Sequence, residues 1–176
     1  MLFDLVGPVA SAQTTNIRYK NANTATAGAD SVIEGPQNTA DMVADGNSTV
    51  YPAAHFCNDL VIGGFSDWYM PAKNELEVCY YNLKPNTTSN NTSHGTNTNA
   101  VPSRGSNYTS GNPAQTTAAD FKDTGAEYFE PSFYWSSTEY SASAAWDQGF
   151  NTGYQGNDSK TTSSNFRVRA IRRVAV

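Results

Sequence analysis

The sequence predicts an α+β domain in which two helices pack on a small antiparallel sheet. Segments that begin with proline and carry apolar residues at helical spacing fill the first half of the chain, whereas strand-like runs between short polar turns fill its last third. With 176 residues, the chain is long enough for one domain with a real core. We therefore assign residues 36–176 to one domain and residues 1–35 to an extended N-terminal arm.

The arm is expected because short apolar and polar stretches alternate over residues 1–35, with one strand near Ile17 to Tyr19. The triplet Ala10-Ser11-Ala12 resembles a signal-peptidase site. However, the apolar run before it is short, lacks a basic start and is broken by Asp4 and Pro8. We therefore interpret this segment as part of the arm.

Two short helices are expected next. The first begins at a cap on Asn38 or Thr39 and ends at Gly46, and the second has Pro52 in its first turn. The second helix has one apolar face with i, i+3, i+4, i+7 spacing, formed by Ala53, Phe56, Cys57 and Leu60.

A further strand and helix follow the glycine pair of "GGFSDWYMPAKNELEVCYYN". The letters "DWYM" indicate a short strand, and Pro71 opens a helix on which Leu76, Cys79 and Tyr80 share one side. After this helix, residues 86–117 contain few aliphatic residues and show no period. They predict a long polar insertion that is disordered alone or ordered by neighbours in a larger assembly.

The last third of the chain predicts the sheet, through the runs "FYWSSTEY", "AAWDQGFNTGY" and "NFRVRAIRRVAV". Because side chains alternate between the faces of a strand, Trp146 and Phe150 are expected to point inward and Asp147 outward. The large aromatic residues of the expected core are Trp68, Trp135, Trp146 and Phe150.

Composition and charge exclude some partners. The net charge is −5 and only 15% of the residues are charged, which argues against nucleic acid, because affinity for a phosphate backbone draws on clustered Lys and Arg. No apolar segment approaches the ~20 residues needed to cross a bilayer, so we expect no membrane insertion.

The reactive side chains predict no catalytic centre. Cys57 and Cys79 lie outside any CxxC pair and are expected to be small buried hydrophobes, and neither His55 nor His94 has a credible catalytic partner nearby in the sequence. We therefore expect no enzymatic activity, no cofactor and no metal site.

A glycan-cleaving enzyme remains a third hypothesis. Asp123, Glu127 and Glu130 could supply the two carboxyl groups that glycoside hydrolysis needs, about 5 to 9.5 Å apart. A surface acidic patch is the commoner reason for such residues.

The motifs "GGFSDWYMPAKNELEVCYYN", "YWSSTEYSASAAWDQGF" and "FRVRAIRRV", taken in this order, resemble the C-type-lectin-like domain of many phage tail-fibre and bacterial surface proteins. That domain is related to the variable proteins of diversity-generating retroelements and, more distantly, to the formylglycine-generating enzyme. The resemblance runs from about Asp41 to Val174, apart from the insertion, and implies a C-type-lectin-like fold.

Two departures limit what the resemblance implies. The reactive cysteine pair near the C-terminus of the formylglycine-generating enzyme has no counterpart here, which removes that catalysis. Calcium-dependent lectins use Glu-Pro-Asn, whereas this chain has "EPS" at 130–132, placed before the Trp-Ser-Ser strand. Because a calcium site also needs several converging oxygens, no calcium is expected.

The resemblance also implies a ligand face on the C-terminal strands and their loops. By position, that face would use Tyr140, Ser141, Ser143, Asp147, Asn151, Tyr154, Asn157, Asp158 and Asn165. Tyr, Ser and Asn suit recognition, because Tyr gives contact area at small entropy cost and the others adapt their hydrogen bonds.

The function that follows is a phage virion surface protein, on a tail fibre or other appendage, that recognises a bacterial surface glycan or protein. The alternative is a purely structural virion protein, such as a capsid decoration or tail adaptor. In either case the arm and the insertion would contact other virion proteins. A homo-oligomer is expected, with a trimer as the candidate because fibres are commonly three-fold, although no segment has coiled-coil periodicity.

Overall fold

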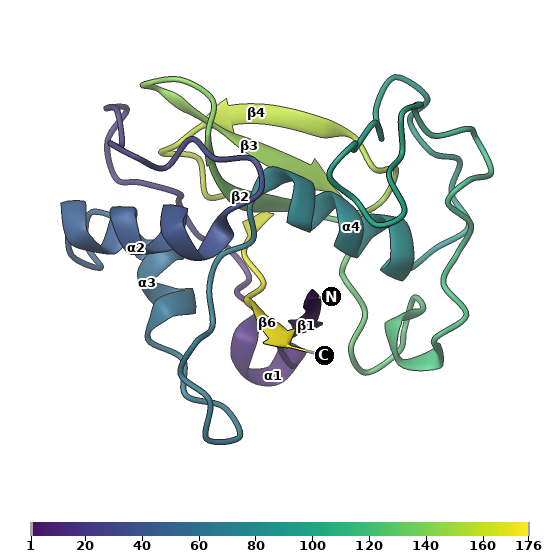
Figure 1. Ribbon diagram of the computed structural model, residues 1–176, viewed down its shortest axis with the longest axis horizontal. Coiled ribbons are helices and arrows are strands. Elements are labelled where there is room, and N and C mark those ends of the chain that lie inside the picture. Colours follow the sequence, from purple (N-terminus) through teal and green to yellow (C-terminus); the bar gives the residue numbers. More distant parts are fainter. Residues whose placement is uncertain (1, 176) are drawn as a thin grey trace.

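The computed structural model describes residues 2–175, with side chains from 6 to 174. Its main sheet has four strands in the order β4-β3-β2-β5 (Figure 1). These strands are β2 (Phe133–Glu139), β3 (Ala144–Gly149), β4 (Gln155–Ser159) and β5 (Phe166–Arg167). β2, β3 and β4 are antiparallel neighbours, but β5 pairs with β2 in parallel. The α+β class is confirmed, and the wholly antiparallel sheet is corrected to a mixed one, because the chain crosses from one sheet edge to the other between β4 and β5.

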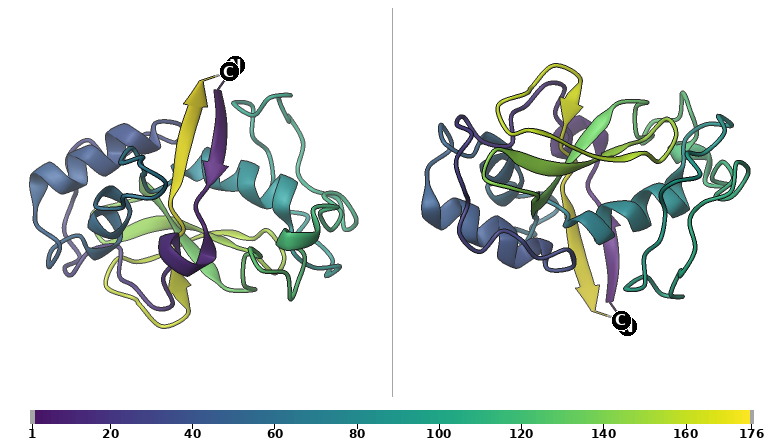
Figure 2. Two further views of the ribbon diagram at one scale, coloured as in Figure 1. Left: turned by 90° about the horizontal axis from the view of Figure 1, so that it is seen from below. Right: turned by 90° about the horizontal axis from the view of Figure 1, so that it is seen from above.

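A second, two-stranded sheet joins the chain ends. β1 (Leu2–Val6) pairs antiparallel with β6 (Ile171–Ala175), and this ribbon projects from the domain on the side away from the main sheet (Figure 2). The run "NFRVRAIRRVAV" is therefore split between two sheets.

Residues 7–35, which belong to the segment expected as an extended arm, pack along the domain. Short α1 (Val9–Ala12) follows β1. Beyond it, the N–H groups of Thr14 and Ile17 bond the carbonyls of Val168 and Phe166 at 3.1 and 2.9 Å. The buried Tyr19 ring meets Trp135 edge-on, with centroids 6.0 Å apart. The aromatic residue in this segment therefore completes the core, which holds the chain against the domain, and residues 17–19 form no strand.

Three α-helices follow this segment in the sequence and precede the strands of the main sheet. They are α2 (Gly35–Asp45), α3 (Pro52–Asn58) and α4 (Lys73–Leu83). α3 starts at Pro52 as predicted. α2 starts before the predicted cap, because Pro36 occupies its first turn and Thr39 is already inside the helix, where its hydroxyl bonds the Gly35 carbonyl at 2.7 Å. Gly35 itself touches the start of α4, since an added Cβ would lie 2.8 Å from the Ala72 nitrogen.

α4 packs under the sheet, with Leu76, Cys79 and Tyr80 buried as its spacing predicts (Figure 1). Its first turn is closed by Glu75, whose carboxylate accepts the Ala72 N–H at 2.8 Å. The expected "DWYM" strand is reduced to a single bridge between Tyr69 and Ile171.

The polar insertion, residues 86–117, has no helix or strand but is ordered by α4 of the same chain. Buried Glu77 accepts hydrogen bonds from Arg104, Asn97 and the Tyr108 hydroxyl. Directly after the helix, buried Lys84 donates to the carbonyls of Thr88 and Pro113 at 2.5 and 3.4 Å. These side chains replace the apolar contacts that the insertion lacks, and a short 3₁₀ turn, η1 (Ala119–Phe121), follows it.

The aromatic residues form two apolar clusters. Trp68 and Trp135 are buried in the cluster beside α2 and α3, and Phe150 lies in the cluster beneath α4, stacked on Phe129 with centroids 4.0 Å apart. Trp146, expected in the core, is only half-buried because it lies on β3 beside Lys73, the half-buried first residue of α4.

Candidate functional site

Most of the nine residues of the expected ligand face lie on the surface. Tyr140 and Tyr154 are 53% and 43% exposed. The exposed polar members are Ser143, Asn151, Asn157, Asp158 and Asn165, while Ser141 is half-buried. Asp147 differs from the rest because only 2% of its surface is exposed.

The order of the strands in the sheet determines which of these residues lie near one another. Asn157 and Asp158 lie on β4, the edge strand next to β3, and Tyr140 follows β2 at its turn into β3. Asn165 lies at the opposite edge, where its carbonyl accepts the Phe133 N–H at 3.2 Å. The structure therefore gathers the β3–β4 residues and leaves Asn165 apart from them.

One aromatic cluster combines Tyr140, Trp146 and Lys73. The Tyr140 ring meets the Trp146 ring edge-on at 4.9 Å between centroids, and the Lys73 ammonium nitrogen lies 3.8 Å from the centre of the same indole. Partial burial lowers the pKa of Lys73. Its backbone is fixed because the Lys73 N–H donates to the Thr138 hydroxyl at 2.9 Å. The indole thus carries a lysine and an exposed tyrosine in fixed positions.

A second cluster covers the free edge of β4. His94, from the insertion, accepts the Gln155 N–H at its Nδ1 at 3.1 Å, and its ring meets Tyr154 at 4.7 Å between centroids. Burial lowers the pKa of His94, and the charge of Lys73 lowers it further, which favours the neutral ring that can accept this hydrogen bond. The insertion thereby protects an edge strand and orients Tyr154.

Asp147 is a buried residue of β3, an inner strand of the main sheet. It faces Trp135 on β2 and Gly156 on β4. Neither carboxylate oxygen has a hydrogen-bond partner of normal geometry among the described residues. Burial, with the nearby charge of Asp158, raises the pKa of Asp147 to about 7, and the Gly156 N–H lowers it by a smaller amount. An added Cβ on Gly156 would lie 2.7 Å from the Tyr154 ring, so glycine allows that ring to lie beside the carboxylate.

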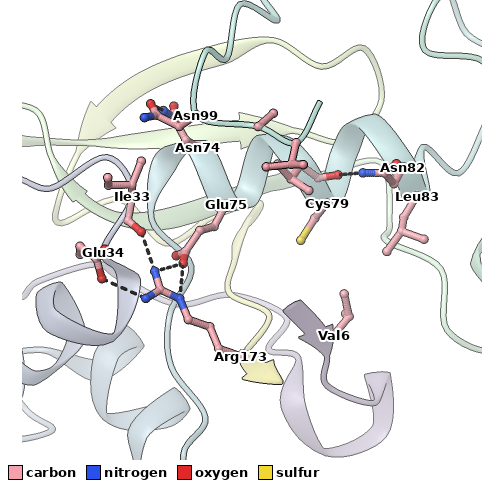
Figure 3. A pocket seen from close by; sticks show the side chains of 13 residues that line it. Val6, Ile33, Glu34, Asn74, Glu75, Cys79, Asn82, Leu83, Asn99 and Arg173 are labelled. Carbon is pink, nitrogen blue, oxygen red and sulfur yellow. Dashed lines mark hydrogen bonds and ion pairs between the residues drawn. The ribbon is translucent and has the colours of Figure 1, made fainter. Parts of the chain in front are cut away.

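A cavity of about 630 Å³ lies elsewhere, between α4 and the β1/β6 ribbon (Figure 3). Its apolar lining comes mainly from α4, and one end holds Arg173 between Glu34 and Glu75. None of the nine expected ligand-face residues lines it. The molecule therefore offers two separate candidate sites, the aromatic surface at β3–β4 and this cavity.

Sequence reasoning missed Lys73 and His94. Lys73 was hidden as the first residue of an amphipathic helix, and His94 as one polar residue of an insertion without pattern. His94 has no acidic residue near it in the sequence, whereas Glu77 lies four residues after Lys73, so the helical spacing suggests an ion pair rather than a contact with an indole.

Two of the three carboxyl groups considered for glycan cleavage lie in ion pairs. Glu127 and Glu130 are each engaged by an arginine, Arg169 at 2.7 Å and Arg167 at 2.6 Å. Among the described residues, no group of three or more His, Cys, Asp or Glu side chains is placed to hold a metal ion. Burial raises the pKa of the Cys57 thiol, which disfavours the reactive thiolate.

None of the described helices has the length and hydropathy needed to cross a membrane. A family model described as the Lcl C-terminal domain matches residues 13–172, which include the main sheet, α2 to α4 and the insertion. No curated protein and no solved structure matches the chain. The C-type-lectin-like assignment therefore stays a prediction.

Proposed function

We propose a function from the premise that the chain belongs to the Lcl C-terminal domain family, which is linked to surface proteins of phages and bacteria. The protein acts at a surface, as a receptor-recognition domain on a phage tail fibre or similar appendage. Its ligand is a glycan or protein of the bacterial surface, and the domain binds this ligand without catalysis.

The observation that carries the proposal is the pair of exposed tyrosines at β3–β4. Each tyrosine is held by another ring, Tyr140 by Trp146 at 4.9 Å and Tyr154 by His94 at 4.7 Å. Large rings fixed before binding lose little conformational entropy when a ligand arrives.

Polar groups around the two tyrosines complete the surface. Ser143, Asn157 and Asp158 are exposed hydroxyl, amide and carboxylate side chains on or next to β3 and β4. Such groups can exchange their bonds to water for bonds to sugar hydroxyls or to a peptide backbone.

The test is binding of the labelled protein to intact candidate host cells. The double variant Tyr140→Ala/Tyr154→Ala should lose saturable binding while its circular dichroism stays unchanged. The matched control is Phe65→Ala, which removes a ring that is 49% exposed on the turn after α3, far along the chain from the strands. Equal loss in both variants would contradict a face located at β3–β4.

A structural role in the virion is the second candidate, favoured by the exposed apolar tip of the α3–α4 connection. Val61 and Phe65 are 71% and 49% exposed there, and a neighbouring subunit could cover them. In this case the double tyrosine variant would bind cells as poorly as the wild type, and Phe65→Ala would weaken assembly. We propose a homo-oligomer, with a trimer as the first state to test by light scattering.

A further inference from the structure

We propose that the cavity between α4 and the β1/β6 ribbon binds a small aliphatic primary amine. Its volume of about 630 Å³ falls within the ~300–1,000 Å³ usual for small-molecule sites. Because it shares no lining residue with the expected ligand face, this site is independent of the proposed recognition function.

The apolar part of the cavity suits a hydrocarbon chain. α4 contributes Val78, Cys79 and Leu83 to one wall, and Val6 of β1 and Val101 of the insertion also line the space (Figure 3). Between Val78 and Leu83 the helix rises by roughly 7 Å, long enough for a short alkyl group. Burying that group removes apolar surface of both ligand and protein from water.

The charged end of the cavity favours a cation. Arg173 is the one basic residue in its described lining, and its guanidinium is already engaged. It donates to Glu75 Oε1 at 3.2 and 2.7 Å, to Glu34 Oε2 at 3.0 Å and to the Ile33 carbonyl at 2.7 Å. Two carboxylates facing one guanidinium leave this end negative, so an anionic ligand would be repelled.

Acceptors for an ammonium group are present in the lining. Asn82 donates one amide N–H to the Val78 carbonyl at 2.9 Å and Asn74 donates one to Asn99 at 2.8 Å, and the side-chain oxygens of Asn74 and Asn82 can accept from a ligand. Within the described residues, the second oxygen of Glu34 accepts no hydrogen bond. A primary ammonium offers three donors and no acceptor, and is charged at neutral pH because its pKa is about 10. The cavity and this ligand class are therefore complementary in shape and charge.

The test compares hexylamine, hexanol and hexanoate by titration calorimetry, since these ligands share one alkyl chain and differ in the head group. We expect hexylamine to bind at least tenfold more tightly than hexanol, and hexanoate not to bind. The proposal would be overturned if hexanol bound as tightly as hexylamine, if hexanoate bound, or if none of the three ligands bound. Nα-acetyl-lysinamide binding more tightly than hexylamine would also overturn it, in favour of a lysine side chain from a partner protein.

Two variants place the binding in this cavity. Glu34→Gln should weaken hexylamine by at least tenfold and leave hexanol unchanged, whereas Val78→Phe fills the space and should abolish both. The matched control is Asp67→Asn, which removes the partner of Arg172, the residue beside Arg173, outside the cavity. Hexylamine affinity that survives both cavity variants would refute the location, and Val78→Phe keeps the test decisive if Glu34→Gln does not fold. Cell binding is measured separately, so neither proposal depends on the result of the other.

Discussion

Replacing Asp147 by Asn should stabilise the protein at neutral and basic pH. In the folded state the pKa of this carboxyl is raised from 3.8 to about 7, first by burial and then by the charge of Asp158. The folded protein therefore resists ionisation of Asp147, whereas the unfolded chain ionises it freely. Since the unfolded state loses this proton first, the carboxyl lowers the free energy of unfolding as the pH rises from about 4 to about 7.

The size of the effect follows from the pKa difference. A rise from 3.8 to about 7 corresponds to about 4 kcal/mol, fully expressed above pH 7 and absent below pH 4. Asn has nearly the same shape and never ionises. The variant should therefore exceed the wild type by up to about 4 kcal/mol at pH 8, and the two should converge near pH 4.

The assay is urea unfolding of both proteins in steps from about pH 4 to about pH 8, with linear extrapolation to water. Asp158→Asn is the matched control, because it removes an exposed neighbouring charge and should give a smaller gain of the same sign. A stability difference between wild type and Asp147→Asn that stays constant across this range would refute the reasoning. It would mean that the carboxyl titrates normally despite its burial.

Three further changes test other parts of the structure. Glu77→Gln removes a buried charge that pairs with Arg104. We expect the free energy of unfolding in urea to fall by about 3–5 kcal/mol and hydrogen exchange in the insertion to become faster. Unchanged exchange in the insertion would contradict its anchoring by α4. Lys73→Met keeps an apolar chain on the Trp146 indole but removes the positive charge, so the pKa of His94 should rise in an NMR titration. An unchanged pKa of His94 would show that the two residues are not coupled. Gly35→Ala adds a methyl against the start of α4 and should cost about 1–3 kcal/mol in thermal unfolding, whereas no loss would show that α2 can shift without penalty.

Sequence reasoning succeeded where one local rule decided the outcome. Pro52 and the spacing of Leu76 and Tyr80 predicted α3 and the buried side of α4, because helix starts and apolar periodicity depend on nearby residues. It failed for β4, whose letters "QGNDS" have no strand preference. This strand exists because its backbone pairs with β3 residue by residue, which is a tertiary contact.

The ligand face shows the same limit at the level of single residues. Alternation places Asp147 and Trp146 on opposite faces of β3, but the predicted directions were wrong: Asp147, expected outward, is buried, and Trp146, expected inward, is half-buried. Asp147 lies opposite Trp135, against which the distant Tyr19 packs, and this side of β3 is the buried one. A strand pattern states which side chains are on the same face, and only the packing of distant segments decides which face meets solvent.

The two proposed sites differ in their charged groups, so we expect their ligand affinities to respond differently to salt. Seven of the eleven Lys and Arg side chains lie in ion pairs within the described part of the chain. Lys73 is outside this set and rests on an indole. Because the β3–β4 surface presents mainly rings, amides and hydroxyls, its binding to cells should change little as salt increases. The amine cavity, with Glu34 exposed to solvent, should lose affinity under the same change, since salt screens exposed charges beyond about 8 Å at physiological ionic strength. Strong salt dependence of cell binding would instead indicate that an ionic surface makes the contact and would redirect the search from the tyrosines to the charged residues around them.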